Sequence, residues 1–158
     1  MQAKIEKHGN EYLVTYERHL EHSLEEVWAM LTDNKKLALW FDELRVARLG
    51  KDGYFNFDMG DGTFQRMDIT DFKDHHILEY TWDENLVRFE LTPESNHCNL
   101  VFTETITELT THTPKDLAGW HVCLDVIGLL LDQEEVNDRM DNWKYWFEIY
   151  SEAIESLT

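Results

Sequence analysis

The chain has 158 residues, of which 42% are hydrophobic and 13% aromatic, and its 14 basic and 32 acidic residues give a net charge of −18. This length and apolar content suffice for one folded domain with a substantial core, and the small number of glycines and prolines argues against a disordered protein. Because a strongly acidic surface repels phosphate backbones and anionic lipid headgroups, we expect neither nucleic acid nor a membrane surface as a partner.

The N-terminus and the cysteines indicate a cytoplasmic protein. The first residues contain no apolar run typical of a secretory signal, and no stretch approaches the ~18 consecutive apolar residues of a membrane span. Cys98 and Cys123 form no CxxC pair, so we interpret both as small apolar fillers in a reducing compartment. These features do not decide the oligomeric state.

The N-terminal part of the chain predicts one strand and two short helices. Residues 11–20 are rich in β-forming residues and mostly alternate between apolar and polar, which is typical of a strand. Ser23-Leu24-Glu25-Glu26 matches a capping box and predicts the start of a helix. A second short helix or turn is expected from about Asn34 to Leu39, directly before Trp40-Phe41.

Between Leu44 and Thr107, short alternating runs are separated by turn-forming segments, which predicts a meander of six antiparallel strands. With the first strand, the sheet would have about seven strands. Alternation places apolar side chains on one face and charged side chains on the other, so one face should be covered. The apolar positions of that face are Phe55, Phe57, Met67, Ile69, Leu78, Tyr80, Trp82, Val87, Phe89, Leu91, Leu100, Phe102 and Ile106.

Two helices are predicted after the meander. Thr113-Pro114 should start the first one, with Thr113 as N-cap, and a helix to Asp132 would be about 30 Å long. Its residues Trp120, Leu124, Ile127 and Leu131 form one apolar stripe. After a polar break, a second helix with an aromatic stripe is expected from about Asp138. The whole order predicts an α+β fold in which an antiparallel sheet wraps a long C-terminal helix.

This element order resembles the helix-grip arrangement of START-like (Bet v-like, SRPBCC) domains, and the residues resemble the family of homologues of the heat-shock-protein ATPase activator. The resemblance is carried by residues 23–28, by Trp40-Phe41, by residues 99–105 and by residues 118–125, in which Gly119-Trp120 is the most specific feature. It implies a single START-like domain over residues 1–158. It also implies a cavity between the sheet and the long helix that is suited to lipids, polyketides or flavonoid-like compounds.

The candidate ligand contacts combine the apolar face of the sheet with the stripe of the long helix. For any one of these residues, core packing is the simpler interpretation. Together they favour a pocket, because inward-pointing tryptophan and tyrosine side chains need partners for their polar atoms. The predicted contacts are Trp40, Phe55, Phe57, Met67, Tyr80, Trp82, Phe89, Phe102, Glu104, Trp120, Leu124 and Ile127.

Glu104 leaves two interpretations open. Its position in the alternation puts it on the same strand face as Phe102 and Ile106, where a buried carboxyl would have a raised pKa and could orient a ligand hydroxyl or act as an acid or base. Alternatively, the strand ends close to this residue and Glu104 is solvated at the rim, because acidic side chains are rarely buried.

The sequence contains no recognisable catalytic group, metal site or cofactor site. His121 and Cys123 are two residues apart on a helix and therefore point to different faces, and no His pair has the spacing of a zinc helix. Asp61-Gly62 lacks the remaining ligands of a calcium loop, and no Gly-rich loop opens a helix. We therefore predict no catalytic residue, no metal and no cofactor.

Three functions remain open at this level. The first is non-catalytic binding of a hydrophobic small molecule. The second, implied by the resemblance, is an interaction with a chaperone, although the eukaryotic activators carry an additional domain that a chain of this length does not accommodate. The third is an enzyme of the polyketide cyclase or dehydratase kind, with Glu104 or Tyr80 as acid or base.

Overall fold

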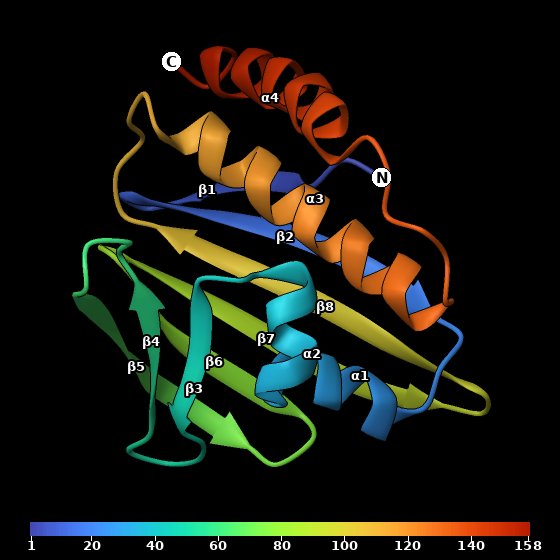
Figure 1. The fold of residues 1–158 in the computed structure, drawn as a ribbon. Helices are drawn as coiled ribbons and strands as arrows, with labels where there is room; N and C mark the ends of the chain where they lie inside the picture. Colours follow the sequence, from blue (N-terminus) through green and yellow to red (C-terminus); the bar gives the residue numbers. More distant parts are fainter. The chain divides into compact units, whose positions relative to one another are not determined.

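The computed structural model describes residues 1–158 and contains eight strands and four helices (Figure 1). The strands are β1 (Lys4–His8), β2 (Glu11–Leu20), β3 (Leu44–Arg48), β4 (Tyr54–Asp58), β5 (Phe64–Lys73), β6 (Ile77–Trp82), β7 (Asn85–Glu94) and β8 (His97–Ile106). The helices are α1 (Leu24–Thr32), α2 (Asn34–Trp40), α3 (Thr113–Leu131) and α4 (Arg139–Glu155).

The chain forms two compact units. The first, which we call the sheet unit, comprises residues Ala3–Thr107 and holds every strand together with α1 and α2. The second, which we call the helical unit, comprises residues Glu108–Thr158 and holds α3 and α4. The prediction of one domain over residues 1–158 stays a prediction.

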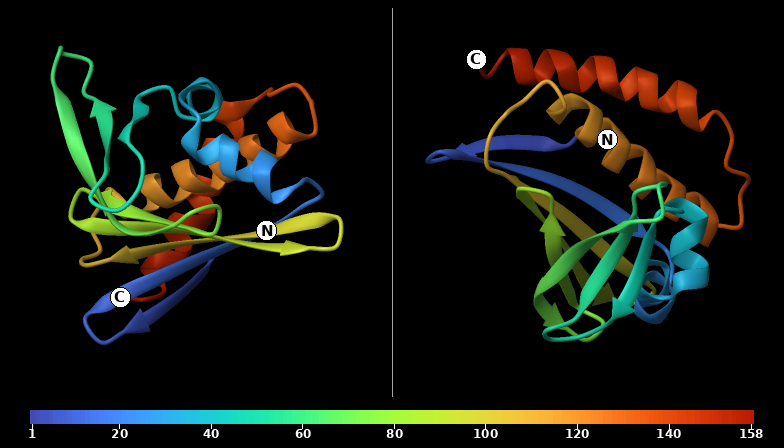
Figure 2. Two further views of the ribbon diagram at one scale, coloured as in Figure 1. Left: turned by 90° about the horizontal axis from the view of Figure 1, so that it is seen from below. Right: turned by 60° about the vertical axis from the view of Figure 1, so that its left-hand side comes forward.

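The sheet is antiparallel throughout, with the strand order β1-β2-β8-β7-β6-β5-β4-β3. The six strands from β3 to β8 follow one another as neighbours, which confirms the predicted meander, and β2 closes onto β8. The sheet is strongly curved (Figure 2). Register shifts interrupt the pairing at Val46/Arg48 and at Ile69/Asp71, where bulges of this kind bend a strand.

The predicted strand count was one too low because the sequence pattern did not indicate β1. This strand is a short edge strand in which Lys4, Glu6 and Lys7 leave little apolar alternation, as is usual where an edge must resist further pairing. A two-residue turn, Gly9-Asn10, joins it to β2, and Gly9 has the positive φ (62°) that such turns require. The Gly9-Asn10 pair was the feature of the sequence from which this hairpin could have been predicted.

The two short helices of the sheet unit begin as the sequence predicts. The Ser23 hydroxyl accepts a hydrogen bond from the Glu26 amide at 3.2 Å, which confirms the N-cap of α1. The Asn34 side chain bonds both the amide and the carbonyl of Val46, and thereby fixes the start of α2 to β3. Trp28 of α1 stacks against His75 and contacts Phe72, so α1 packs at the turn between β5 and β6.

The start of α3 differs from the prediction. His112 is the N-cap residue and Thr113 is the first helical residue. The Thr113 hydroxyl accepts a hydrogen bond from the Thr110 amide, in the turn that precedes the helix, and therefore does not cap the helix. Pro114 still occupies the first turn, where a missing amide hydrogen costs nothing.

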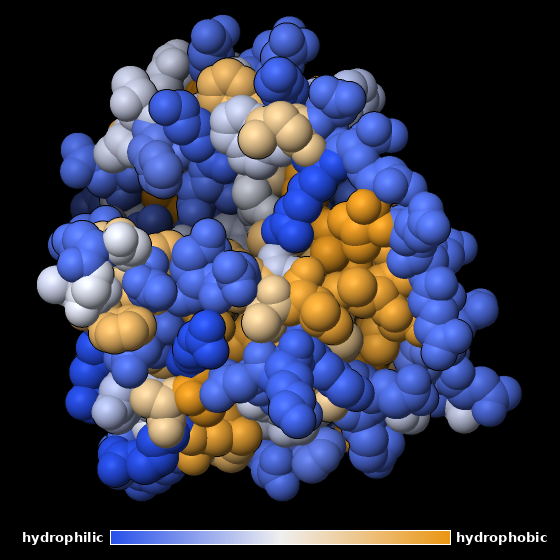
Figure 3. All heavy atoms as spheres, in the orientation of Figure 1, coloured by the Kyte–Doolittle hydropathy of each residue, from blue (hydrophilic) through white to orange (hydrophobic).

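Hydrophilic side chains cover most of the surface seen in Figure 3, as the net charge of −18 leads one to expect. One larger apolar area lies over the second half of α3, where Leu129, Leu130 and Leu131 are half-buried (Figure 3). None of the helices combines the length and the apolar character that a membrane span needs.

Candidate functional site

One face of the sheet collects most of the predicted contact residues, and we call it the aromatic face. In register across the strands, Tyr16 of β2 pairs with Phe102 of β8, Phe102 pairs with Phe89 of β7, and Phe89 pairs with Leu78 of β6. All four of these residues are buried. The alternation in the sequence therefore predicted this face correctly, and it places large side chains next to one another on consecutive strands.

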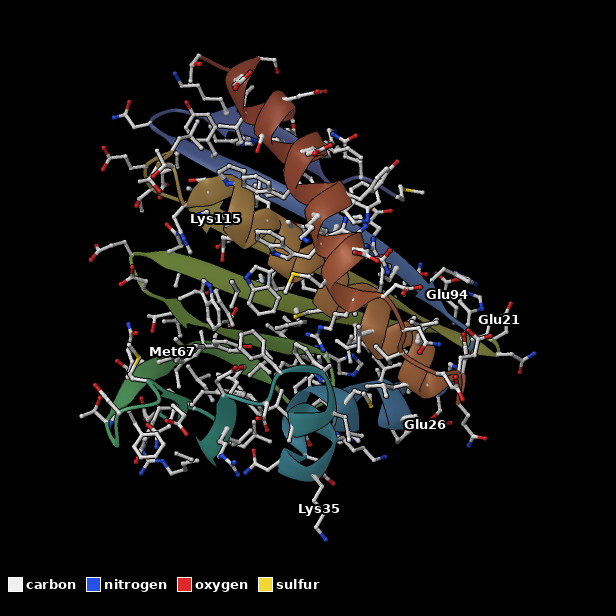
Figure 4. The ribbon with its side chains drawn as sticks, turned by 45° about the horizontal axis from the view of Figure 1, so that its top comes forward. Glu21, Glu26, Lys35, Met67, Glu94 and Lys115 are labelled. Atoms are coloured by element: carbon white, nitrogen blue, oxygen red, sulfur yellow. The ribbon has the colours of Figure 1, made fainter.

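The rings of the aromatic face contact one another across the curved sheet. Phe89 and Phe102 have ring centroids 4.8 Å apart, and Tyr80 lies 6.2 Å from Phe89. Phe55 of β4 stacks on Tyr80 of β6 at 4.4 Å, although β5 lies between these strands and next-but-one strands are about 10 Å apart. The two rings therefore lean together over β5, which indicates that the aromatic face is concave. Met67 lies on β5 and pairs with Phe55 (Figure 4).

Glu104 is part of the aromatic face. It pairs with Val14 on one side and with Val87 on the other, and its side chain is 0% exposed. The alternative of a solvated residue at the rim is wrong, because β8 continues two residues further to Ile106 and is paired with both neighbouring strands as far as Thr105.

A second aromatic cluster lies at one end of this face and is only half-buried. Phe41, which directly follows α2, meets Phe57 at 5.9 Å and Trp82 at 5.5 Å, and these two rings are themselves 5.9 Å apart. All three contacts are edge-to-face. Each of the three side chains is partly exposed, so the cluster has the character of a rim around the buried rings.

Trp40 has a structural role that the sequence did not show. Its indole Nε1–H donates a hydrogen bond of 2.7 Å to the carbonyl of Met30, which links α2 to α1. The polar atom of this buried tryptophan is therefore satisfied by the backbone. Trp40 supports the site, and its role as a ligand contact stays a prediction.

The remaining predicted contacts belong to the helical unit. Trp120, Leu124 and Ile127 lie on α3 and are at most 2% exposed. Their burial agrees with the apolar stripe expected from the sequence, and their role in ligand binding stays a prediction.

The helical unit also contains a buried polar cluster that sequence reasoning missed. His121 of α3 and Tyr150 of α4 are both 0% exposed, and the Nδ1 of the histidine lies 2.8 Å from the tyrosine hydroxyl. Trp146 stacks on the imidazole with centroids 3.6 Å apart. Asp125, one turn beyond His121, places a carboxylate oxygen 3.3 Å from Nε2. With Nε2 protonated toward that carboxylate, the Tyr150 hydroxyl donates to Nδ1.

The opposite face of the sheet is polar and centred on Arg88. Its guanidinium contacts the carboxylates of Asp71, Glu79 and Glu90 at 2.8, 3.0 and 2.6 Å. Burial of Arg88 opposes its charge, but the hydrogen bonds to these acids outweigh that effect and raise its pKa. The hydrogen bond from Arg88 in turn lowers the pKa of Asp71. Charged side chains thus gather on the face opposite the aromatic face, as the sequence predicted.

Two surface clefts of the sheet unit contain none of the predicted contacts. One, of about 410 Å³, is lined by Ser23–Glu25 and Pro93–His97. Glu21, Glu26 and Glu94 lie at that end of the unit (Figure 4). The other cleft, of about 220 Å³, is lined by Lys51, Asp52 and residues 69–72.

No group of three or more His, Cys, Asp or Glu side chains is arranged to hold a metal ion. Asp61 accepts hydrogen bonds from the amide and hydroxyl of Thr63, which lower its pKa and identify this segment as a hairpin turn.

Nine of the predicted contacts therefore lie in the sheet unit, and the other three lie on α3 of the helical unit. It adds Tyr16 and Phe41, which the sequence pattern did not single out. Tyr16 shares the strand parity of Val14, and that alternation was a usable signal. Phe41 lies outside regular structure, so only its contacts in the tertiary structure identify it.

Comparisons with known proteins agree with this architecture. The sequence profile of the family described as "Activator of Hsp90 ATPase homolog 1-like protein" matches residues 21–132. The conserved protein of unknown function EF2215 from Enterococcus faecalis has a similar structure, with a TM-score of 0.90 at 26% identity, covering 99% of this chain and 92% of that one. No curated protein matches the chain by sequence.

Two further solved structures are similar in fold. CalU16 from Micromonospora echinospora matches with a TM-score of 0.71 at 18% identity, over 95% of this chain and 92% of that one. DynU16, a protein of the dynemicin biosynthetic locus, matches with a TM-score of 0.64 at 20% identity, over 76% of this chain and 47% of that one. The chain has the helix-grip fold predicted from its sequence, with eight strands.

Proposed function

The chain belongs to the Activator of Hsp90 ATPase homolog 1-like family, and we propose that it binds a hydrophobic small molecule without transforming it. The observation that carries this proposal is the composition of the aromatic face. Rings from β2, β4, β6, β7 and β8 lie on one buried, concave surface together with a single carboxyl group. Apolar walls with few polar groups are the usual composition of small-molecule sites.

The aromatic residues supply the affinity in this proposal. An aromatic ring contributes a large apolar area, and well-placed aromatic pairs add about 0.5–1.5 kcal/mol beyond the burial of that area. Phe89 and Phe102 present their rings at the centre of the face, and Tyr80 adds a ring with a hydroxyl. A lipid, a polyketide or a flavonoid-like molecule offers the matching apolar surface. That DynU16 belongs to the dynemicin biosynthetic locus supports this ligand class by likeness of fold.

A titration with a neutral hydrophobic probe tests the proposal. N-phenyl-1-naphthylamine should bind saturably, and Phe89→Leu, which removes a central ring at similar volume, should weaken binding about three- to tenfold. Phe64→Leu is the matched control, because Phe64 is 57% exposed on β5. Native mass spectrometry of gently purified protein would add direct evidence of a bound species. A protein that binds neither the probe nor any copurifying molecule has a filled core, and the proposal would then be wrong.

A chaperone-directed function is the second candidate, and the family match favours it. The acidic surface would be the contact region in that case, since the net charge of −18 suits a basic partner surface. The purified chain would then stimulate the ATPase of the cognate Hsp90 in a manner that weakens with added salt. An unchanged ATPase rate at saturating concentrations of the chain would rule out this second function.

A further inference from the structure

Phe41, Phe57 and Trp82, which we call the aromatic rim, differ in two ways from the buried rings of the aromatic face. Their ring planes stand nearly perpendicular to one another, with interplanar angles of 79°, 79° and 80°. Each of the three side chains is also partly exposed. Rings at right angles turn their faces in different directions instead of covering them in a stack. The aromatic rim therefore offers ring surface to a molecule that arrives from solvent.

Backbone hydrogen bonds hold the one ring of the aromatic rim that lies outside regular structure. The Phe41 amide donates to the carbonyl of Leu37 at 2.8 Å, which fixes Phe41 to the end of α2. Two residues further, the carbonyl of Glu43 accepts a hydrogen bond of 2.8 Å from the amide of Asp58. This second bond ties the same loop to the end of β4, directly beside Phe57. The rings are thus held in place before any ligand binds, which lowers the cost of binding.

Acidic residues follow every ring of the aromatic rim in the chain. These five residues are Asp42 and Glu43 after Phe41, Asp58 after Phe57, and Asp83 and Glu84 after Trp82. On the neighbouring strands, Arg45 and Arg66 both pair with Asn56, so strand alternation places these arginines on the face opposite Phe57. The charges around the aromatic rim therefore favour a cation over an anion.

The rings and their spacing indicate which kind of cation fits. A cation is attracted to the face of an aromatic ring when it lies within about 6 Å of the ring centroid. The three centroids of the aromatic rim are 5.5–5.9 Å apart, so one cation can lie within that limit of all three rings. A quaternary ammonium group carries methyl groups in place of N–H donors, and it therefore loses no hydrogen bonds when aromatic rings replace its water. A primary ammonium would lose them.

We propose that the aromatic rim binds a quaternary ammonium group, and that the ligand of this protein is an amphiphile with such a head group and an apolar tail. This inference rests on the proposed binding function, because the tail occupies the aromatic face. Trp82 lies 6.5 Å from Tyr80, which in turn stacks on Phe55 at 4.4 Å. The rings thus continue without interruption from the aromatic rim to the buried part of the face.

Four probes that share a naphthylmethyl group separate the possible head groups. They are (2-naphthylmethyl)trimethylammonium, its uncharged carbon isostere 2-neopentylnaphthalene, the primary ammonium 2-naphthylmethylamine, and the anion 2-naphthylacetate. Their affinities are measured by displacement of N-phenyl-1-naphthylamine from the full-length protein at about 0.15 M salt, which screens distant charges. For the wild type, we expect the quaternary cation to bind about fivefold or more tightly than both its isostere and the primary ammonium, and the anion to bind most weakly.

Two variants assign this preference to the aromatic rim. Trp82→Leu and Phe41→Leu each remove one ring, and each should lower the ratio of quaternary to isostere affinity about threefold. Phe64→Leu is the matched control, because Phe64 pairs with Asp58 on the face opposite Phe57, and it should change no ratio. In the wild type, nuclear Overhauser effects should join the methyl protons of the quaternary probe to ring protons of Trp82. That measurement needs no variant and decides the inference if a variant does not fold.

Every outcome decides the inference. Equal affinities of the wild type for the quaternary cation and its isostere would overturn it. Equal affinities for the quaternary and primary cations would also overturn it, because the acidic surface alone attracts any cation. Ratios that stay unchanged in both variants, or the absence of Overhauser effects to Trp82, would place the head group elsewhere. In all these cases hydrophobic binding itself stands, whereas a wild type that does not bind N-phenyl-1-naphthylamine would remove the proposed function and the inference together.

Discussion

The buried hydrogen bond between Tyr150 and His121 gives a sharp stability prediction. Tyr150→Phe removes one hydroxyl and keeps the ring, so the contact with Trp146, at a centroid distance of 5.8 Å, should persist and no large cavity should form. The change therefore removes the 2.8 Å bond between α3 and α4.

The magnitude follows from the burial of both partners. Because Tyr150 and His121 are 0% exposed, water cannot readily replace the lost hydroxyl, and the Nδ1 of His121 loses its donor inside the protein. A buried group left in this state costs about 1–3 kcal/mol. We therefore expect the free energy of unfolding to fall by that amount, well above the effect of a typical surface substitution.

Urea unfolding followed by tryptophan fluorescence measures the change, and Tyr145→Phe is the matched control. Tyr145 lies on the same helix but is 61% exposed, so its hydroxyl is in contact with water and its removal should change stability by less than about 0.5 kcal/mol. Hydrogen exchange should also accelerate in α4 of Tyr150→Phe. If the two variants were equally stable, the bond would contribute nothing to the attachment of α4, and the expected cost of losing the buried hydroxyl would be refuted.

Two further predictions concern groups whose pKa is shifted. Because the hydrogen bond from Arg88 lowers the pKa of Asp71 in the folded state, its stabilising effect is fully present above the unfolded pKa and is lost as the pH falls through the folded one. Asp71→Asn should therefore be less stable than the wild type at neutral pH, and urea unfolding in a pH series should show this difference shrink as the pH falls below about 4. A difference that does not change with pH in the acid range would contradict the assignment. Burial raises the pKa of the Cys98 thiol, and we therefore expect iodoacetamide to label Cys98 in the native protein only as fast as the sheet opens. Mass spectrometry measures this labelling, and rapid labelling in native buffer would show that the thiol is exposed.

The sequence by itself determined the elements whose signal is local. Alternation and turn residues were sufficient for the six strands from β3 to β8, because the side-chain period of a strand assigns every residue to a face. The same parity was sufficient to put Glu104 on the face of Phe102. The capping residues of α1 were equally readable, since the bond from the Glu26 amide to Ser23 spans only three residues.

Only the tertiary structure decided the features that depend on distant partners. Parity alone could not tell whether Glu104 was solvated or buried, because that depends on Val14 and Val87, which lie 90 and 17 positions away in the chain and pair with it on either side. Likewise, His121 meets Tyr150 across 29 residues, and nothing in the local pattern of either helix indicates the pair. A periodic pattern specifies which face a side chain takes, whereas burial and hydrogen bonding depend on what the fold brings against that face.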